Sequence, residues 1–113
     1  MMKSKIHRAT ITDTNLDYVG SITLDPELMA RADILEFEQV VVLDIDNGSR
    51  FETYAMAGGP GDVIVNGAAA HLVGPGHRVI VITYGSYDEA ELEGFAPKVV
   101  HVDEDRKSTR LNS

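Results

Sequence analysis

Ser21, Arg50 and Tyr54 are the residues of this chain whose side chains best fit catalytic work. A serine hydroxyl can act as a nucleophile, although no Gly-x-Ser-x-Gly elbow surrounds Ser21. A guanidinium stays charged and grips a carboxylate through two parallel hydrogen bonds. A tyrosine, with an ordinary pKa near ~10, stays protonated and can donate its proton. Each residue also has a plainer structural role, as a turn residue, a strand-edge arginine or a half-buried sheet aromatic.

The spacing of these residues constrains how they can meet. In a regular strand, Arg50, Glu52 and Tyr54 project from one face and Thr53 from the other. A site that uses both Thr53 and Tyr54 therefore requires an irregular strand or a contribution from a neighbouring subunit.

Other candidate sites fail on spacing. The run from Asp44 to Gly48 resembles a calcium loop, but its glycine falls one position early and Ala55 stands where the bidentate glutamate belongs. Residues 58–61 are glycine-rich but lack the Lys-Ser/Thr pair of a phosphate-binding loop. The histidines show no paired metal-ligand spacing, so we predict no metal site. They are His7, His71, His77 and His101.

The elements that must position these residues are mostly strands, because short apolar segments alternate with turn residues. Residues 40–46 and 50–56 flank Asn47–Gly48, a strong hairpin signal, and residues 78–84 are typical of a strand buried on both faces. Asp25 and Pro26 predict the start of a helix over residues 25–32. Further strands are expected near 3–11, 21–24, 62–65 and 97–102, and single helical turns near 66–71 and 88–93. A small closed β-barrel with short helices accommodates them, since closure removes exposed strand edges.

The composition is typical of a one-domain globular protein and argues against membrane-spanning, disulfide-linked and nucleic-acid-binding proteins. The 113 residues fit one domain, with 43% hydrophobic and 25% charged residues, as in ordinary globular proteins. No apolar run approaches the ~20 residues of a membrane span, and no signal peptide is evident. The absence of cysteine excludes disulfides and thiolate chemistry and fits a cytoplasmic location. A net charge of −8 argues against a nucleic-acid partner and draws attention to two scarce cations, Lys5 and Arg50.

Residues 105–113 differ in character from the rest of the chain. This run, Asp105-Arg-Lys-Ser-Thr-Arg-Leu-Asn-Ser113, resembles the translation of a common sequencing adapter. We therefore predict one domain over residues 1–104 and treat 105–113 as an artefactual tail, the alternative being a natural disordered end. Without the tail the charge becomes 7 minus 17, or −10.

Four segments, in order, resemble the pyruvoyl-dependent aspartate 1-decarboxylases, also called aspartate alpha-decarboxylases. The segments are Lys5-Ile-His-Arg8, Asn15–Asp25 around Gly20–Ser21, Arg50-Phe-Glu-Thr-Tyr54 and Asn66-Gly-Ala-Ala-Ala-His71. The match runs from about Lys5 to His101 with one short gap. It departs from some members at Leu43, where they carry a tryptophan, and in a loop at 58–62 that is about two residues shorter.

The resemblance implies a closed six-stranded double-psi β-barrel, assembled as a homotetramer with active sites between subunits. It implies that the Gly20–Ser21 bond cuts itself, leaving a short β chain, residues 1–20, and a longer α chain headed by a pyruvoyl group formed from Ser21. That cofactor would decarboxylate L-aspartate to β-alanine and CO2 through a Schiff base, for pantothenate and coenzyme A synthesis. Glycine suits the cleavage site because it permits a strained turn and an unobstructed carbonyl, and strain of ~1–3 kcal/mol would help the shift to an ester.

The family's residue roles carry over to matching positions of this chain. Ser21 and Tyr54 would be catalytic, with Tyr54 protonating the carbanion, and Thr53 would assist cleavage. Substrate would be bound by Arg50, Thr53, Gly67, Ala68 and Ala69, with support from Lys5, His7, Tyr18 and Asn66. Two alternatives stay open: a non-catalytic double-psi-barrel module, and a decarboxylase for another acidic amino acid.

Overall fold

The computed structural model describes residues 1–102 and the backbone of residues 108–112. Its strands are β1 (Met2–Thr10), β2 (Asp13–Asn15), β3 (Ser21–Leu24), β4 (Gln39–Asp44), β5 (Arg50–Ala57), β6 (Val63–Asn66), β7 (Arg78–Tyr84), β8 (Lys98–Val102) and β9 (Ser108–Asn112). The helical elements are α1 (Pro26–Arg31) and the 3-10 turns η1 (Gly67–His71) and η2 (Glu89–Leu92). The mainly β class with short helices is confirmed.

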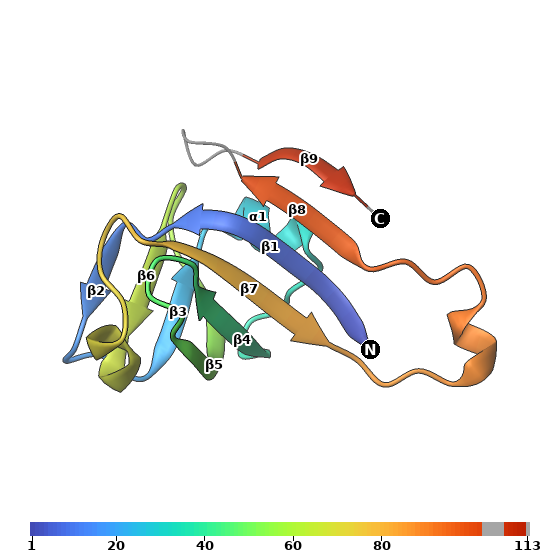
Figure 1. The fold of residues 1–113 in the computed structure, drawn as a ribbon, viewed down its shortest axis with the longest axis horizontal. Helices are drawn as coiled ribbons and strands as arrows, with labels where there is room; N and C mark the ends of the chain where they lie inside the picture. Colours follow the sequence, from blue (N-terminus) through green and yellow to red (C-terminus); the bar gives the residue numbers. More distant parts are fainter. Residues whose placement is uncertain (103–107, 113) are drawn as a thin grey trace.

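All nine strands join in one hydrogen-bonded order, β2-β6-β3-β5-β4-β7-β1-β8-β9 (Figure 1). Three pairs are parallel: β1 with β8, β2 with β6, and β3 with β5. Seven of the nine described strands coincide with segments expected as strands, and β2 and β9 lie in addition at the two ends of this order, so the described chain has more strands than the six that the resemblance implies. The pairing of the described strands runs from one end to the other, so the predicted closure is not among these hydrogen bonds.

One continuous core lies on the inner face of the sheet. It includes Ile6 of β1, Ile22 of β3 and Val65 of β6, each with no exposed surface. In β7, Val79 and Val81 are buried, whereas Ile80 and Ile82 on the opposite face are only half-buried. The prediction that this strand is buried on both faces was therefore wrong for the single chain.

Local signals positioned the helix and the hairpin correctly. The Asp25 carboxylate caps α1 by accepting a hydrogen bond from the Glu27 backbone N–H at 2.8 Å. β4 and β5 pair antiparallel around Asn47–Gly48, with Gly48 at φ +77°. β5, which carries Arg50 and Tyr54, pairs with β4 on one side and with β3 on the other.

Two outlying segments complete the chain. The stretch between β7 and β8 carries η2 and projects beyond the sheet (Figure 1). Within it, the ring centroids of Tyr87 and Phe95 lie 4.7 Å apart. β9, within the segment predicted to be an adapter-derived tail, pairs antiparallel with β8. The origin of that segment stays a prediction, and residues 103–107 and 113 lie outside the described residues. Among the described helices, none has the length and apolar character to cross a membrane.

Candidate active site

The Ser21 hydroxyl is buried and held by two hydrogen bonds. β3 begins at Ser21, which pairs with Asn66 at the end of β6, and the two residues are 2% and 3% exposed. Ser21 Oγ donates to the Val19 carbonyl at 2.9 Å and accepts from Asn66 Nδ2 at 3.1 Å. The predicted nucleophile and Asn66, predicted as a supporting residue, are therefore in direct contact.

The first residue of η1, Gly67, packs closely against the backbone of Gly20. Gly67 has φ +77°, and a Cβ added there would lie 2.7 Å from Gly20 Cα and 2.9 Å from Gly20 N. By contrast, a Cβ added at Gly20 would meet nothing within 4 Å, and φ of Gly20 lies outside the left-handed region. The predicted strained glycine conformation is thus not found at Gly20, and the position that demands glycine is Gly67. Contact with the dipeptide itself is made by the η1 backbone.

A cavity of about 300 Å³ opens beside the Gly20–Ser21 peptide. Its lining includes both residues of that dipeptide with Tyr18, Phe37, Tyr54 and Met56. Tyr54, on β5, thus shares a cavity with Ser21. None of the described residues that line this cavity carries a charge.

Arg50 lies in a different place from Ser21. The side chains of β5 alternate, so that Arg50, Glu52 and Tyr54 are exposed on one face and Thr53 is buried on the other. The strand is therefore regular, which removes an irregular strand from the two alternatives that the spacing left open. Arg50 lines a separate cavity, also of about 300 Å³, together with Glu38 and Glu52.

Lys5 and His7 form a third group, on β1. In the strand order, β7 and β4 separate β1 from β5, the strand that carries Tyr54. The His7 ring packs edge-on against His101 at 5.6 Å, and its buried Nδ1 has no hydrogen-bond partner among the described residues. Burial, with the nearby charges of Lys5, His101 and Arg8, lowers the pKa of His7 and favours the neutral ring.

Of the remaining predicted residues, Ala68 is exposed on η1, whereas Ala69 is half-buried and packs against the core. Sequence spacing did not predict the contact between His7 and His101, because it arises from the parallel pairing of β1 and β8. No spacing rule links two residues so far apart in the chain.

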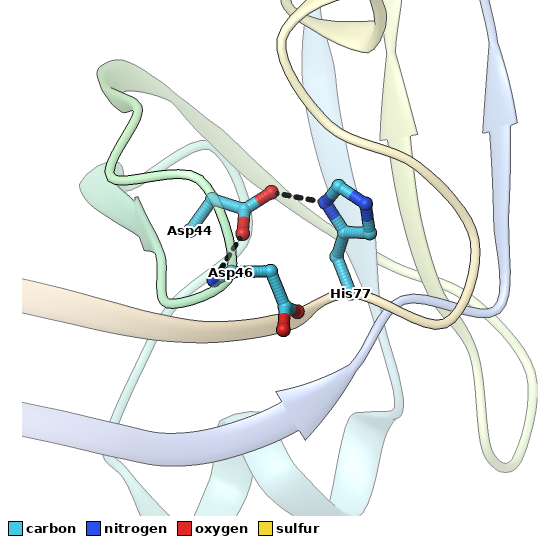
Figure 2. A group of neighbouring side chains, drawn as sticks. All are labelled: Asp44, Asp46 and His77. Carbon is cyan, nitrogen blue, oxygen red and sulfur yellow. Dashed lines mark hydrogen bonds and ion pairs between the residues drawn. The ribbon is translucent and has the colours of Figure 1, made fainter.

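Asp44, Asp46 and His77 form a polar group that sequence spacing also missed (Figure 2). One ligand atom from each lies within 4.8 Å of the others, an arrangement that could hold a metal ion. The Asp44 side chain is fully buried, and its Oδ2 lies 2.6 Å from His77 Nδ1. This hydrogen bond raises the pKa of His77 above 6.5, aided by the charges of Asp44 and Asp46. Asp44 Oδ1 accepts from the Asp46 backbone N–H at 2.8 Å, so a structural role accounts for the buried carboxylate.

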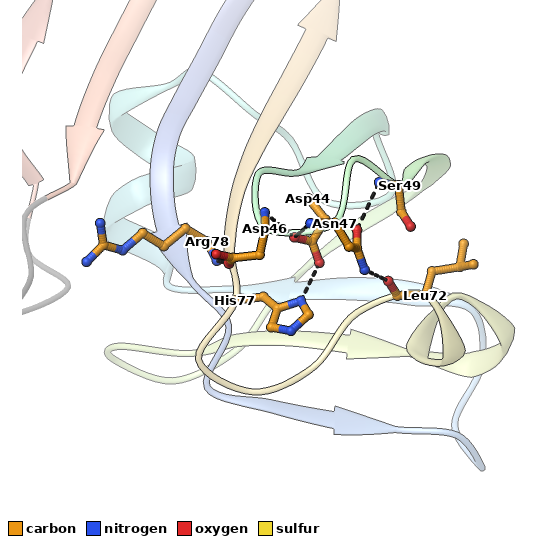
Figure 3. A network of polar contacts seen from close by, with 7 residues as sticks. All are labelled: Asp44, Asp46, Asn47, Ser49, Leu72, His77 and Arg78. Atoms are coloured by element: carbon orange, nitrogen blue, oxygen red, sulfur yellow. Dashed lines mark hydrogen bonds and ion pairs between the residues drawn. The ribbon is translucent and has the colours of Figure 1, made fainter.

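The same network extends through Asn47, whose backbone N–H donates to Asp44 Oδ1 at 3.3 Å, to Leu72 beside η1 (Figure 3). Asn47 Oδ1 accepts from the Ser49 backbone N–H at 2.9 Å, and Asn47 Nδ2 donates to the Leu72 carbonyl at 2.7 Å. Leu72 caps the C-terminal end of η1, whose first residue presses on Gly20. The β4–β5 turn therefore anchors the segment that contacts the dipeptide.

Comparison with known proteins identifies the family of this chain. The family model described as aspartate decarboxylase matches residues 1–109. An aspartate 1-decarboxylase of Acetivibrio thermocellus is 56% identical over 115 residues, covering 100% of this chain and 91% of the relative. The chain belongs to the aspartate decarboxylase family.

Proposed function

We propose that this chain is a self-processing aspartate 1-decarboxylase that converts L-aspartate to β-alanine and CO2, supplying pantothenate and coenzyme A synthesis in the cytoplasm. Family membership supports the reaction. The observation that carries the self-processing is the buried Ser21 hydroxyl, held by Asn66 beside a Gly20 that η1 keeps in place.

Self-processing is a sequence of bond changes at one dipeptide. Ser21 Oγ attacks the Gly20 carbonyl carbon, an O–C bond replaces the C–N bond, and the hydroxyl proton passes to the freed nitrogen. Elimination then removes the Ser21 Cα proton and releases residues 1–20 with a free carboxylate. Water adds to the dehydrated residue and ammonia leaves, so that a pyruvoyl group caps the longer chain.

Thr53 is well placed to assist this step. The parallel pairing of β3 and β5 matches Ile22 with Ala55. Continued back by two residues, this register brings Thr53 level with Gly20. The buried Thr53 hydroxyl supports a proposed role in stabilising the oxygen that gains charge during the attack.

In decarboxylation, the pyruvoyl group supplies an electron sink that no side chain offers. Tyr54 shares the cavity of Ser21 and is the proposed proton donor to the substrate carbon after CO2 leaves. The proposed substrate contacts also include backbone groups of η1, next to the Gly20–Ser21 dipeptide. These groups belong to Gly67, Ala68 and Ala69. Arg50 is the proposed partner of a substrate carboxylate.

The positions of the positively charged side chains support active sites that are shared between subunits. L-aspartate carries two carboxylates, yet the described residues that line the Ser21 cavity carry no positive charge. The cations Arg50 and Lys5 lie on other parts of the same chain. We therefore propose a homotetramer in which a neighbouring copy brings these cations to each Ser21 cavity. The half-buried Ile80 and Ile82 supply an apolar outer face for such contacts.

We also propose that residues 1–104 form a closed double-psi barrel. Core residues from β1 and from β3 to β8 gather in a single cluster, which supports a sheet wrapped around one interior. The parallel pairs between otherwise antiparallel strands support crossed connections of this kind.

The first test is the intact mass of the purified protein under denaturing conditions. Two fragments that divide after Gly20, with the larger one lacking a free amino terminus, would support the proposal. A larger fragment that begins with an intact serine, or a single uncut chain, would contradict the formation of the cofactor. Activity on aspartate compared with glutamate would then test the substrate.

A further inference from the structure

We infer that Thr23 is a positioning residue for self-cleavage, acting on the Ser21 hydroxyl through the Asn66 amide. This inference rests on the proposed self-processing. Thr23 follows Ser21 by two residues on β3, and it touches neither the Gly20 carbonyl nor the Ser21 hydroxyl in any described hydrogen bond.

The Asn66 amide has two N–H groups and two hydroxyl acceptors. Asn66 Nδ2 donates to Ser21 Oγ at 3.1 Å and to Thr23 Oγ1 at 3.0 Å. Because both hydrogens have a partner, this orientation is favoured over the flipped amide, which would present Oδ1 to Ser21. In the flipped orientation, the Ser21 hydroxyl would have to donate its proton to Asn66 Oδ1. Its hydrogen bond to the Val19 carbonyl would then be lost.

The Thr23 side chain is itself fixed by packing. A Cβ added at Gly58 would lie only 2.4 Å from Thr23 Cγ2, so the threonine methyl occupies the space above this glycine. The Gly58 backbone is in turn tied to β3 by a hydrogen bond from its N–H to the Leu24 carbonyl at 2.9 Å. A β-branched side chain with its methyl held there has its hydroxyl directed by the same rotamer, in this case to Asn66.

The consequence is a defined hydrogen-bonding state of the nucleophile. With Asn66 as a donor, Ser21 Oγ keeps its proton on the Val19 side and one lone pair free to attack the Gly20 carbonyl. Without the Thr23 hydroxyl, the buried amide loses one acceptor and samples other orientations. Loss of one neutral buried hydrogen bond predicts self-cleavage slowed by about 3- to 10-fold.

The test compares rates of self-cleavage in the full-length chain, followed by intact mass after rapid purification. Thr23→Val keeps the shape and removes the hydroxyl, whereas Thr23→Ser keeps the hydroxyl. We expect Thr23→Val to cleave about 3- to 10-fold more slowly than wild type and Thr23→Ser to cleave at nearly the wild-type rate. Equal rates for the valine and wild-type chains would overturn the inference.

A second pair of variants tests the inference if Thr23→Val folds poorly. Thr23→Ser and Thr23→Ala both lack the methyl and differ only in the hydroxyl, so slower cleavage of the alanine chain supports the role of that group. Equal rates for this pair would overturn it.

A double-mutant comparison separates an effect of Thr23 through Asn66 from a general effect of Thr23 on the fold. In Asn66→Ala chains, adding Thr23→Val is expected to cause no further slowing, because the intermediary is already gone. The same fold-change in both backgrounds would overturn a role through Asn66. A wild-type chain that never cleaves would instead refute the proposed self-processing itself, and the inference with it.

Discussion

Substitution of Gly67 by alanine tests the contact between η1 and the cleavage dipeptide. The new Cβ would lie 2.7 Å from Gly20 Cα and 2.9 Å from Gly20 N, well inside the ~3.5–4.0 Å of an ordinary carbon contact. Both neighbours are backbone atoms, so relief requires movement of η1 or of the dipeptide. We assign about 1–3 kcal/mol to this overpacking and about 1–2 kcal/mol to an alanine at φ +77°.

Gly48 provides a matched control. It has the same φ, +77°, but a Cβ there would meet nothing within 4 Å. Gly48→Ala therefore carries only the backbone cost of about 1–2 kcal/mol. The difference between the two variants isolates the contact with Gly20, with an expected value of about 1–3 kcal/mol.

The assay has two readouts. Urea unfolding of both variants, in a Ser21→Ala background that cannot cleave, gives the two losses of stability. Self-cleavage in the presence of Ser21 then shows whether the dipeptide has moved: we expect Gly67→Ala to stay uncut and Gly48→Ala to mature. Equal destabilisation of the two variants, or normal maturation of Gly67→Ala, would refute the reasoning.

Three further predictions concern single side chains. Tyr54→Phe should mature normally yet form β-alanine at least ~100-fold more slowly, since it lacks the proton donor; a full turnover rate would remove that role. Arg50→Ala should raise the KM for aspartate by about 10- to 100-fold, and an unchanged KM would count against the carboxylate contact. For His77, whose pKa is raised from 6.5 by its bond to Asp44, the stabilisation is complete below pH 6.5 and is lost as the pH rises through the raised pKa. The urea midpoint of wild type should therefore exceed that of His77→Gln at low pH and approach it at high pH, whereas a constant difference would exclude this linkage.

The strands were predictable where local pattern and burial agree. Residues 21–24 and 78–84, expected as strands, coincide with β3 and β7, and Asn47–Gly48 does form the expected hairpin. β2 was missed because Asp13–Asn15 is a short polar strand defined only by its pairing with β6. The burial of the outer face of β7 was predicted wrongly. Its isoleucines are residues typical of a core, but in the single chain they are only half-buried.

The residues of the candidate site remain predictions, and their geometry could not be derived from the sequence. Residue types and the family resemblance named Ser21, Tyr54 and Asn66, which the fold brings around one cavity or into direct contact. Nothing local indicated that Thr23 shares the Asn66 amide, because that contact depends on the register of β3 and β6. Asp44 and His77 likewise meet because β4 pairs with β7, which places the end of one strand beside the start of the other.

The position of β1 has a consequence for the lifetime of the mature protein. β1 belongs to residues 1–20, yet it lies between β7 and β8 and places Ile6 and Ala9 in the core. After cleavage, the short chain would be retained only by non-covalent contacts, and unfolding would separate two molecules that must find each other again. Maturation would thus turn refolding from a concentration-independent process into a bimolecular one. Once denatured in dilute solution, the active form would recover far less readily than its uncut precursor.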